Sequence, residues 1–335
     1  MNWTVRRWLG AICAAMLMTG AAPPADAATI RLAGEYGISY LPLTVIKTQH
    51  LLEQLGEQQG MNVKTTWLQF TGGAAMNEAL IAGDLDIATG GVAPMVLLWA
   101  RTRDNLRVQA IAALNTMPLY LNTIDPGVHS IKDFKDTDRI AMPAAGVSIQ
   151  AITLMMASAK EFGPDQAKKL NPLTVSMSHP DGMAALLARK AGITAHFTSP
   201  PYMYEELTKP GVHRVLDSYD VLGGPATFNL VWTTERFMRK NPKIAPLFVA
   251  ALKQADDFIA DHPDGAAQIY TESTRTSLSH AELVKMIEDP EIHWTIVPER
   301  TMEYARFMAK IGMIKAAPAS WQDLFFPTMD GEPGS

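Results

Sequence analysis

The sequence predicts an α/β fold of two lobes joined by two crossing strands, and three observations support this prediction. Strand-like and helix-like segments alternate along the chain, which is typical of sheets built mostly from parallel strands. Residues 79–89 and 185–195 resemble each other, since each segment is a helix end, a short turn and a buried strand. The chain has 335 residues, 47% of them hydrophobic, which is enough for one large domain or two lobes.

The first third of the chain is predicted to alternate strands with helices. Strands are expected over residues 29–34, 62–70, 84–89 and 106–114, and the second of them alternates apolar and polar side chains. Helices are expected over residues 40–60 and 72–83. Gly60 and Gly83 stand at their ends, where glycine is a common helix stop.

A second series of strands and helices follows a strand that leaves the first sheet. The leaving segment covers residues 119–134, and a returning strand is expected within residues 221–237. Between them, strands are predicted over residues 139–142, 173–175, 193–197 and 214–216. We therefore predict that residues 28–122 and 225–335, with the amphipathic helices at the end of the chain, form lobe one, and that residues 123–224 form lobe two.

One helix, predicted over residues 148–162, begins in a way that suits ligand binding. Ser148 is a good N-cap, apolar residues recur after it at helical spacing, and Gly163 with Pro164 ends the helix. The free N–H groups and partial positive charge of a helix start can hold an anion. This segment alone leaves open whether Ser148 contacts a ligand or only caps the helix.

The first 27 residues predict an export signal. Arg6 and Arg7 precede a short apolar run, and residues 25–27 read Ala-Asp-Ala, the pattern of a cleavage site. The run is too short to span a membrane. We expect cleavage after Ala27 and a periplasmic protein. Val5 precedes the arginine pair, which favours the general secretory route over the twin-arginine route.

Composition and motifs exclude several classes of function. The single cysteine, Cys13, lies in the export segment, so disulfides, thiol catalysis and cysteine metal sites are excluded from the exported chain. A net charge of −5 argues against nucleic acid and anionic membranes as partners. No G-x-S-x-G elbow, Walker loop or H-E-x-x-H motif occurs. His179 and Asp181 are interpreted as a helix start, and not as a catalytic pair. We predict a binding protein without catalytic residues, metal or cofactor.

Four segments, read in order, resemble a known family. They are residues 70–94, 128–154, 182–202 and 225–242, and they resemble the periplasmic solute-binding proteins of ABC transporters in the nitrate, sulfonate and taurine branch. The resemblance implies a two-lobe fold of the type II-like kind, with two hinge crossings and a ligand cleft between the lobes. It also implies a monomer whose partners are a small-molecule ligand and a transporter permease with its ATPase.

The same resemblance assigns ligand contacts by position. Lobe one is expected to supply Tyr36, Thr71, Gly72, Gly91, Val92 and Asn115, lobe two Val147, Ser148, Ser199 and Tyr202, and Phe228 is expected near the second crossing. Two helix starts, at Thr71–Gly72 and at Ser148, would then point at one place from opposite sides. Such a pair suits a sulfonate, a carboxylate or a similar anion without requiring an arginine.

One departure from the family bears on the ligand. Many relatives carry an acidic residue before Pro and an aromatic residue, where this chain has Ser199 in the sequence TSPPY. Because that acid can pair with the ammonium of an amino-sulfonate, its loss argues against taurine. Two alternatives stay open: a binding or synthase-like protein for the pyrimidine precursor of thiamine, which has the same fold class, or a binding protein that serves a sensor.

Overall fold

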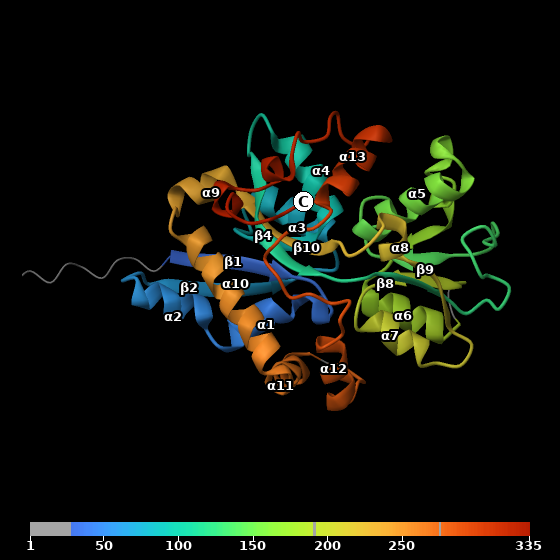
Figure 1. Ribbon diagram of the computed structural model, residues 1–335, viewed down its shortest axis with the longest axis horizontal. Helices are drawn as coiled ribbons and strands as arrows, with labels where there is room; N and C mark the ends of the chain where they lie inside the picture. The colour runs from blue at the N-terminus through green and yellow to red at the C-terminus, as the bar shows by residue number, and fades with distance from the viewer. Residues whose placement is uncertain (1–27, 190–191, 275) are drawn as a thin grey trace, which may run out of the picture.

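The computed structural model describes residues 28–189, 192–274 and 276–335, which form two β-sheets covered by helices. The predicted export signal, residues 1–27, lies outside the described residues. Figure 1 shows the two sheets side by side, with the C-terminal helices lying mainly on the side of the first sheet. No helix in the described part of the chain is both long enough and apolar enough to cross a membrane.

Sheet one has the strand order β2-β1-β3-β10-β4. It consists of a parallel pair and an antiparallel group of three, which are connected by a parallel bridge between Leu32 and Ile87. Its strands are β1 (Ala28–Gly34), β2 (Val63–Gln69), β3 (Ala88–Gly91), β4 (Val108–Thr116) and β10 (Thr227–Thr234). Its helices are α1 (Leu41–Thr48), α2 (Leu51–Gln58), α3 (Gly73–Ala82), α4 (Val92–Thr102), α9 (Glu235–Lys240) and α10 (Ile244–Asp261).

Sheet two repeats this order with its own strands, as β7-β6-β8-β5-β9. Its strands are β5 (Tyr120–Thr123), β6 (Ile140–Met142), β7 (Thr174–Ser176), β8 (Ala195–Thr198) and β9 (His213–Asp217). Its helices are α5 (Ile149–Phe162), α6 (His179–Leu187), α7 (Tyr202–Leu207) and α8 (Ser218–Leu222). The similar segments found in the sequence run from α3 into β3 and from α6 into β8, and these strands are third in each sheet.

Each sheet has a crossing strand in fourth place that runs antiparallel to its neighbours. β10 pairs antiparallel with β3 and β4, and β5 pairs antiparallel with β8 and β9. The sheets are therefore mixed: in each, the crossing strand runs against the other four, which run in one direction, as expected for mostly parallel sheets. β5 belongs wholly to sheet two, so the chain changes sheets at residues 117–119, slightly before the boundary after residue 122 that the sequence predicted.

Two further predictions need correction. The helix expected over residues 40–60 is divided into α1 and α2, because His50 adopts a left-handed conformation with a φ of 53°. Left-handed backbone cannot continue a right-handed helix. The strand expected over residues 84–89 begins only at Ala88. Within the predicted crossing segments 119–134 and 221–237, only residues 120–123 and 227–234 are strand, and the remaining predicted strands lie within two residues of the observed bounds.

A C-terminal segment connects the two sheets beside the crossings. This segment follows α11 (Pro263–Ser273) and α12 (His280–Ile287) and precedes α13 (Thr301–Lys310). Its Glu291 carbonyl accepts a hydrogen bond from the hydroxyl of Tyr219 at 2.9 Å. The hydroxyl of Tyr204 donates to Asp289 at 3.2 Å. On the side of sheet one, the backbone N–H of Thr116 donates to the carbonyl of His293 at 2.9 Å. This segment therefore holds the two halves together in the observed arrangement.

Candidate functional site

Nine of the eleven predicted site residues lie where a strand ends and the following segment begins, while Asn115 lies within β4 and Phe228 within β10. Tyr36 follows β1, Thr71 and Gly72 follow β2, and Gly91 with Val92 joins β3 to α4. Val147 and Ser148 come between β6 and α5, and Ser199 and Tyr202 follow β8. In open α/β sheets, ligands bind at these carboxyl ends of the strands.

Two glycines on the side of sheet one, Gly91 and Gly37, let the two halves of the molecule approach each other closely at this place. A Cβ atom at Gly91 would lie 2.8 Å from Cγ2 of Ile149, which is the first residue of α5. A Cβ atom at Gly37 would lie 2.9 Å from the carbonyl oxygen of Pro200. Gly72 also faces the other half, but at an ordinary van der Waals distance, since a Cβ atom there would lie 3.8 Å from the Cβ atom of Pro143. We call the region between these contacts the junction.

The start of α5 is built as the sequence predicts. The side chain of Ser148 is buried and its Oγ accepts from the backbone N–H of Ala151 at 3.2 Å, which makes Ser148 the N-cap. The first N–H groups of a helix have no partner within the helix. The neighbouring Val147 is partly buried. Because Ile149 contacts Gly91 at the end of β3, this helix start lies against sheet one.

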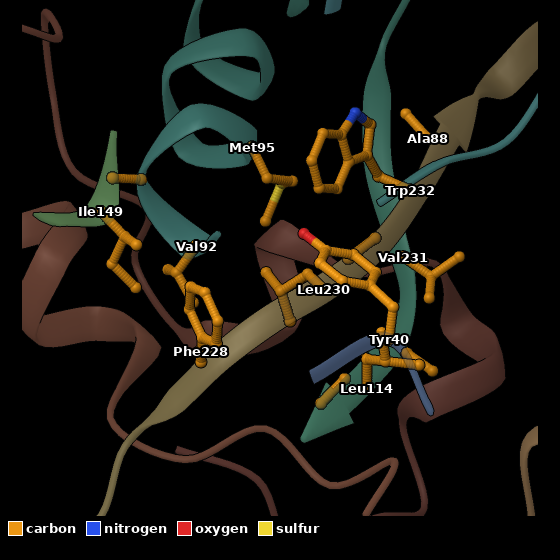
Figure 2. Close-up of a cluster of buried hydrophobic side chains, with 14 of the residues drawn as sticks. Tyr40, Ala88, Val92, Met95, Leu114, Ile149, Phe228, Leu230, Val231 and Trp232 are labelled. Carbon is orange, nitrogen blue, oxygen red and sulfur yellow. The ribbon is translucent and has the colours of Figure 1, made fainter. Parts of the chain in front are cut away.

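An apolar contact occupies the centre of the junction. Figure 2 shows Ile149 of α5 beside Val92 of α4 and Phe228 of β10, and all three side chains are buried. These residues belong to one hydrophobic cluster that includes members from both halves. Two of the predicted contacts, Val92 and Phe228, therefore pack against the helix that carries Ser148.

Ser199 and Tyr202 are positioned by a buried histidine. The rings of His179 and Tyr202 are stacked with their centroids 5.6 Å apart, and the Oγ of Ser199 lies 3.4 Å from Nε2 of His179. Burial, with a smaller effect from His196, holds the pKa of His179 well below its usual range, so the ring is neutral. The prediction that His179 begins a helix is confirmed, since α6 starts there after an N-cap at Ser178.

Asn115 lies at the base of the junction in a network of buried polar groups. Its Nδ2 donates to the carbonyl of Ser39 at 2.5 Å, and its Oδ1 accepts from the backbone N–H of Asn229 at 3.4 Å. The side-chain amide of Asn229 and the hydroxyls of Ser39 and Tyr40 are buried without a hydrogen-bond partner among the described residues. Unpartnered buried polar groups are costly, and a bound molecule can satisfy them.

Glu35 is a residue of this site that the sequence reading missed. It directly follows β1, the residue as a whole is partly exposed while its carboxyl group is buried, and its Oε1 lies 3.0 Å from the position of a Cβ atom at Gly90. Gly90 has a φ of 152°, so the backbone there favours glycine and leaves room for the carboxyl group. The backbone N–H of Gly73, at the start of α3, faces the same carboxyl group.

The surroundings of Glu35 favour its neutral form. Burial raises the pKa of Glu35 to about 8, against a partial opposing effect from the Tyr40 hydroxyl and the Gly73 N–H. The Tyr40 hydroxyl, which points into the cluster in Figure 2, makes no well-formed hydrogen bond to the carboxyl group. The start of α3 thus already faces a carboxyl group of the protein. Thr71, by contrast, is exposed and does not cap α3, whose N-cap is Gly72.

No group of three His, Cys, Asp or Glu side chains that could hold a metal ion occurs within residues 28–189, 192–274 and 276–335. The junction therefore offers helix starts, hydroxyls, amides and one carboxyl group for recognition. These groups can bind a small polar molecule through hydrogen bonds, and the neighbouring apolar side chains can contact its organic part.

Comparison with known proteins agrees with this architecture. The family model described as NMT1/THI5 like matches residues 91–266. The aliphatic sulphonate binding protein SsuA of Escherichia coli has a similar structure, with a TM-score of 0.64 and 17% identity over 88% of this chain and 98% of that chain. A search of the curated proteins found no match.

Two further solved structures share the fold. The alkanesulfonate-binding protein SsuA of Xanthomonas axonopodis, bound to MOPS, has a TM-score of 0.65 and 18% identity, covering 89% of this chain and 96% of that chain. The nitrate-binding protein NrtA of Synechocystis has a TM-score of 0.67 and 13% identity, covering 89% and 84%. The fold class predicted from the sequence is therefore confirmed.

Proposed function

Because the chain belongs to the NMT1/THI5-like family, we propose that it is an extracytoplasmic solute-binding protein that captures a small organic anion for an ABC importer. The single observation that carries the proposal is the start of α5, which lies against the strand ends of sheet one. Helix starts bind anions through their N–H groups and dipole. The ligand class is a sulfonate or carboxylate, in keeping with the sulfonate- and nitrate-binding proteins that share the fold.

The proposed ligand contacts surround the junction. They come from both halves of the chain and comprise Tyr36, Thr71, Gly72, Gly91, Val92, Asn115, Val147, Ser148, Ser199, Tyr202 and Phe228. The exposed ring of Tyr36 and the partly buried ring of Tyr202 would flank the organic part of the ligand. Ser199 would act mainly through the backbone, since its hydroxyl contacts His179.

The two halves act in this proposal as lobes that close on the ligand. Lobe one is built on sheet one, from residues 28–119 and 225–335, and lobe two is built on sheet two, from residues 120–224. A ligand that touches both lobes favours the closed state by its additional contacts there. The protein would work as a periplasmic monomer, exported by the segment that ends at Ala27, and would deliver its ligand to a permease with its ATPase.

Two substitutions at Ser148 test whether the start of α5 binds the ligand. Ser148→Ala is expected to weaken ligand binding by about 1–2 kcal/mol, roughly five- to thirty-fold, because it removes a hydroxyl at the anion. It also removes the N-cap bond to Ala151, which should lower the free energy of unfolding by about 1 kcal/mol with or without ligand. Calorimetry on both variants measures affinity and stability separately.

Ser148→Asp is the sharper variant. Aspartate caps helices well, so the fold should persist, but its negative charge stands beside the proposed anion and should abolish binding. If Ser148→Ala lowers the melting temperature while the dissociation constant stays within twofold, Ser148 is only a cap. Normal binding by Ser148→Asp would mean that α5 does not face the ligand.

A further inference from the structure

We propose that Glu35 takes part in ligand binding as a neutral carboxylic acid, so that capture of an anion is coupled to the uptake of a proton whenever Glu35 is ionised. This inference rests on the proposed function, because it concerns an anion in the same site. It assigns a specificity role to a residue that directly follows β1.

The position of Glu35 is the first argument. Its carboxyl group lies at the start of α3, where the N–H of Gly73 faces it, and Gly90 leaves the room that it fills. The start of α3 is also one of the two helix starts proposed to face the anion. Two negative charges at one helix start repel each other, so an anion bound there disfavours the ionised form of Glu35.

The unsatisfied groups around Glu35 are the second argument. The Tyr40 hydroxyl lies next to this carboxyl group, and the Asn229 amide lies next to the Tyr40 hydroxyl. Both residues are more than nine-tenths buried, and both polar groups lack a well-formed hydrogen bond among the described residues. Buried polar groups of this kind are costly when unpartnered, and a bound oxygen-rich group can satisfy them. A protonated Glu35 adds an O–H donor to this set, whereas an ionised Glu35 can only accept.

The third argument is that no positively charged group lies among these neighbours of Glu35. Tyr40 is the titratable side chain whose contact affects the pKa of Glu35. Gly73 of α3 contributes only its backbone N–H, and Gly90 of β3 lies beside the carboxyl group without a side chain. Trp232 of β10 also lies beside Gly90, and its ring does not titrate. None of these groups supplies a positive charge that would stabilise an ionised Glu35. The raised pKa of about 8 is consistent with a neutral group at neutral pH.

The first experiment needs no ligand. Urea unfolding of the wild type, Glu35→Gln and Glu78→Gln is measured from pH 5 to pH 9. If Glu35 is protonated in the folded protein, the folded state binds more protons than the unfolded state over this range. The folding equilibrium constant of the wild type should then fall by up to tenfold per pH unit, relative to Glu35→Gln, as the pH rises from about 5 to 8.

Glu78→Gln is the matched control, because Glu78 is an exposed residue of α3. It makes the same exchange of a carboxyl group for an amide at an exposed position and should follow the wild-type pH dependence. Parallel curves for the wild type and Glu35→Gln would show that Glu35 is ionised in the folded protein and would overturn the proposal.

The second experiment uses ethanesulfonate and taurine, which differ by one ammonium group, as calorimetric probes from pH 6 to pH 9. Wild-type affinity for ethanesulfonate should fall about tenfold per unit above pH 8, and Glu35→Gln should remove this fall and bind about tenfold more tightly than the wild type at pH 9. A preference for taurine that rises with pH and is lost in Glu35→Gln would mean that an ionised Glu35 binds a cation, which overturns the proposal.

Failure of the proposed function is distinguishable from failure of this inference. If neither probe binds at any pH, sulfonate capture fails and proton-coupled capture fails with it, while the unfolding curves still show whether Glu35 is protonated. If ethanesulfonate binds with the same pH dependence in the wild type and in Glu35→Gln, capture of an anion stands and the role of Glu35 is refuted.

Discussion

Gly91→Ala is expected to weaken ligand binding by about 1–3 kcal/mol, roughly five- to 150-fold, because the added methyl group prevents the lobes from closing. The φ of Gly91 is −61° and its ψ is 153°, so alanine fits the backbone without strain. The cost arises at the junction, where the new Cβ would lie 2.8 Å from Cγ2 and 2.9 Å from Cβ of Ile149.

A double-mutant cycle isolates this contact. In an Ile149→Gly background no Cβ faces position 91, so adding Gly91→Ala should change the binding free energy by less than about 0.5 kcal/mol. Gly331→Ala serves as the control, since a Cβ there meets nothing within 4 Å. Calorimetry gives the affinities, and X-ray scattering gives the radius of gyration, which ligand should reduce in the wild type but not in Gly91→Ala. Equal affinity of the wild type and Gly91→Ala would refute the closed contact as part of the bound state.

Glu206→Ala is expected to lower the free energy of unfolding by about 3–5 kcal/mol, because it leaves a cavity in the core and a buried ring nitrogen of His196 without its hydrogen-bond partner. The Nδ1 of His196 lies 2.5 Å from Oε1 of Glu206, and both side chains are fully buried. Asn122 donates to the other carboxylate oxygen at 2.9 Å and would also lose its partner. Removing one member of a buried pair costs far more than removing an exposed charge.

Urea unfolding at neutral pH measures this loss. Glu78→Ala is the control, because it removes an exposed carboxylate from a helix and should change the unfolding free energy by less than about 0.5 kcal/mol. A loss below about 1 kcal/mol for Glu206→Ala would show that the His196–Glu206 pair does not hold α7 on sheet two. Because His196 neighbours His179, which stacks on Tyr202, Glu206→Ala should also disturb the Tyr202 side of the junction.

The sequence predicted the strand positions well because strand signals are local. Alternation and short apolar runs located β2 and the four strands β6, β7, β8 and β9. The N-cap at Ser148 was equally readable, since capping depends on one residue and the turn that follows. The break between α1 and α2 at His50 could not be predicted, because the left-handed residue at a helix end is usually glycine or asparagine and this position is histidine.

The parts of the site that depend on distant contacts could not be predicted. Glu35 looks like an ordinary acid after a strand, and its neutral character arises only from burial beside Tyr40, Gly73 and Gly90. The His196–Glu206 pair joins β8 to α7 without a recognisable spacing. The family resemblance identified positions around the junction. It could not show which of their hydroxyls already contact another side chain of the protein, as the hydroxyl of Ser199 contacts His179.

The most direct measurement of the central claim is a thermal-shift screen of sulfonates, aromatic carboxylates, nitrate and thiamine precursors on the wild type and Ser148→Asp. A molecule that binds the folded state raises the melting temperature in proportion to the logarithm of its concentration above the dissociation constant. We predict that a sulfonate or a carboxylate stabilises the wild type and that the same molecule does not stabilise Ser148→Asp. Stabilisation by thiamine precursors alone, or an equal shift in both proteins, would contradict the account.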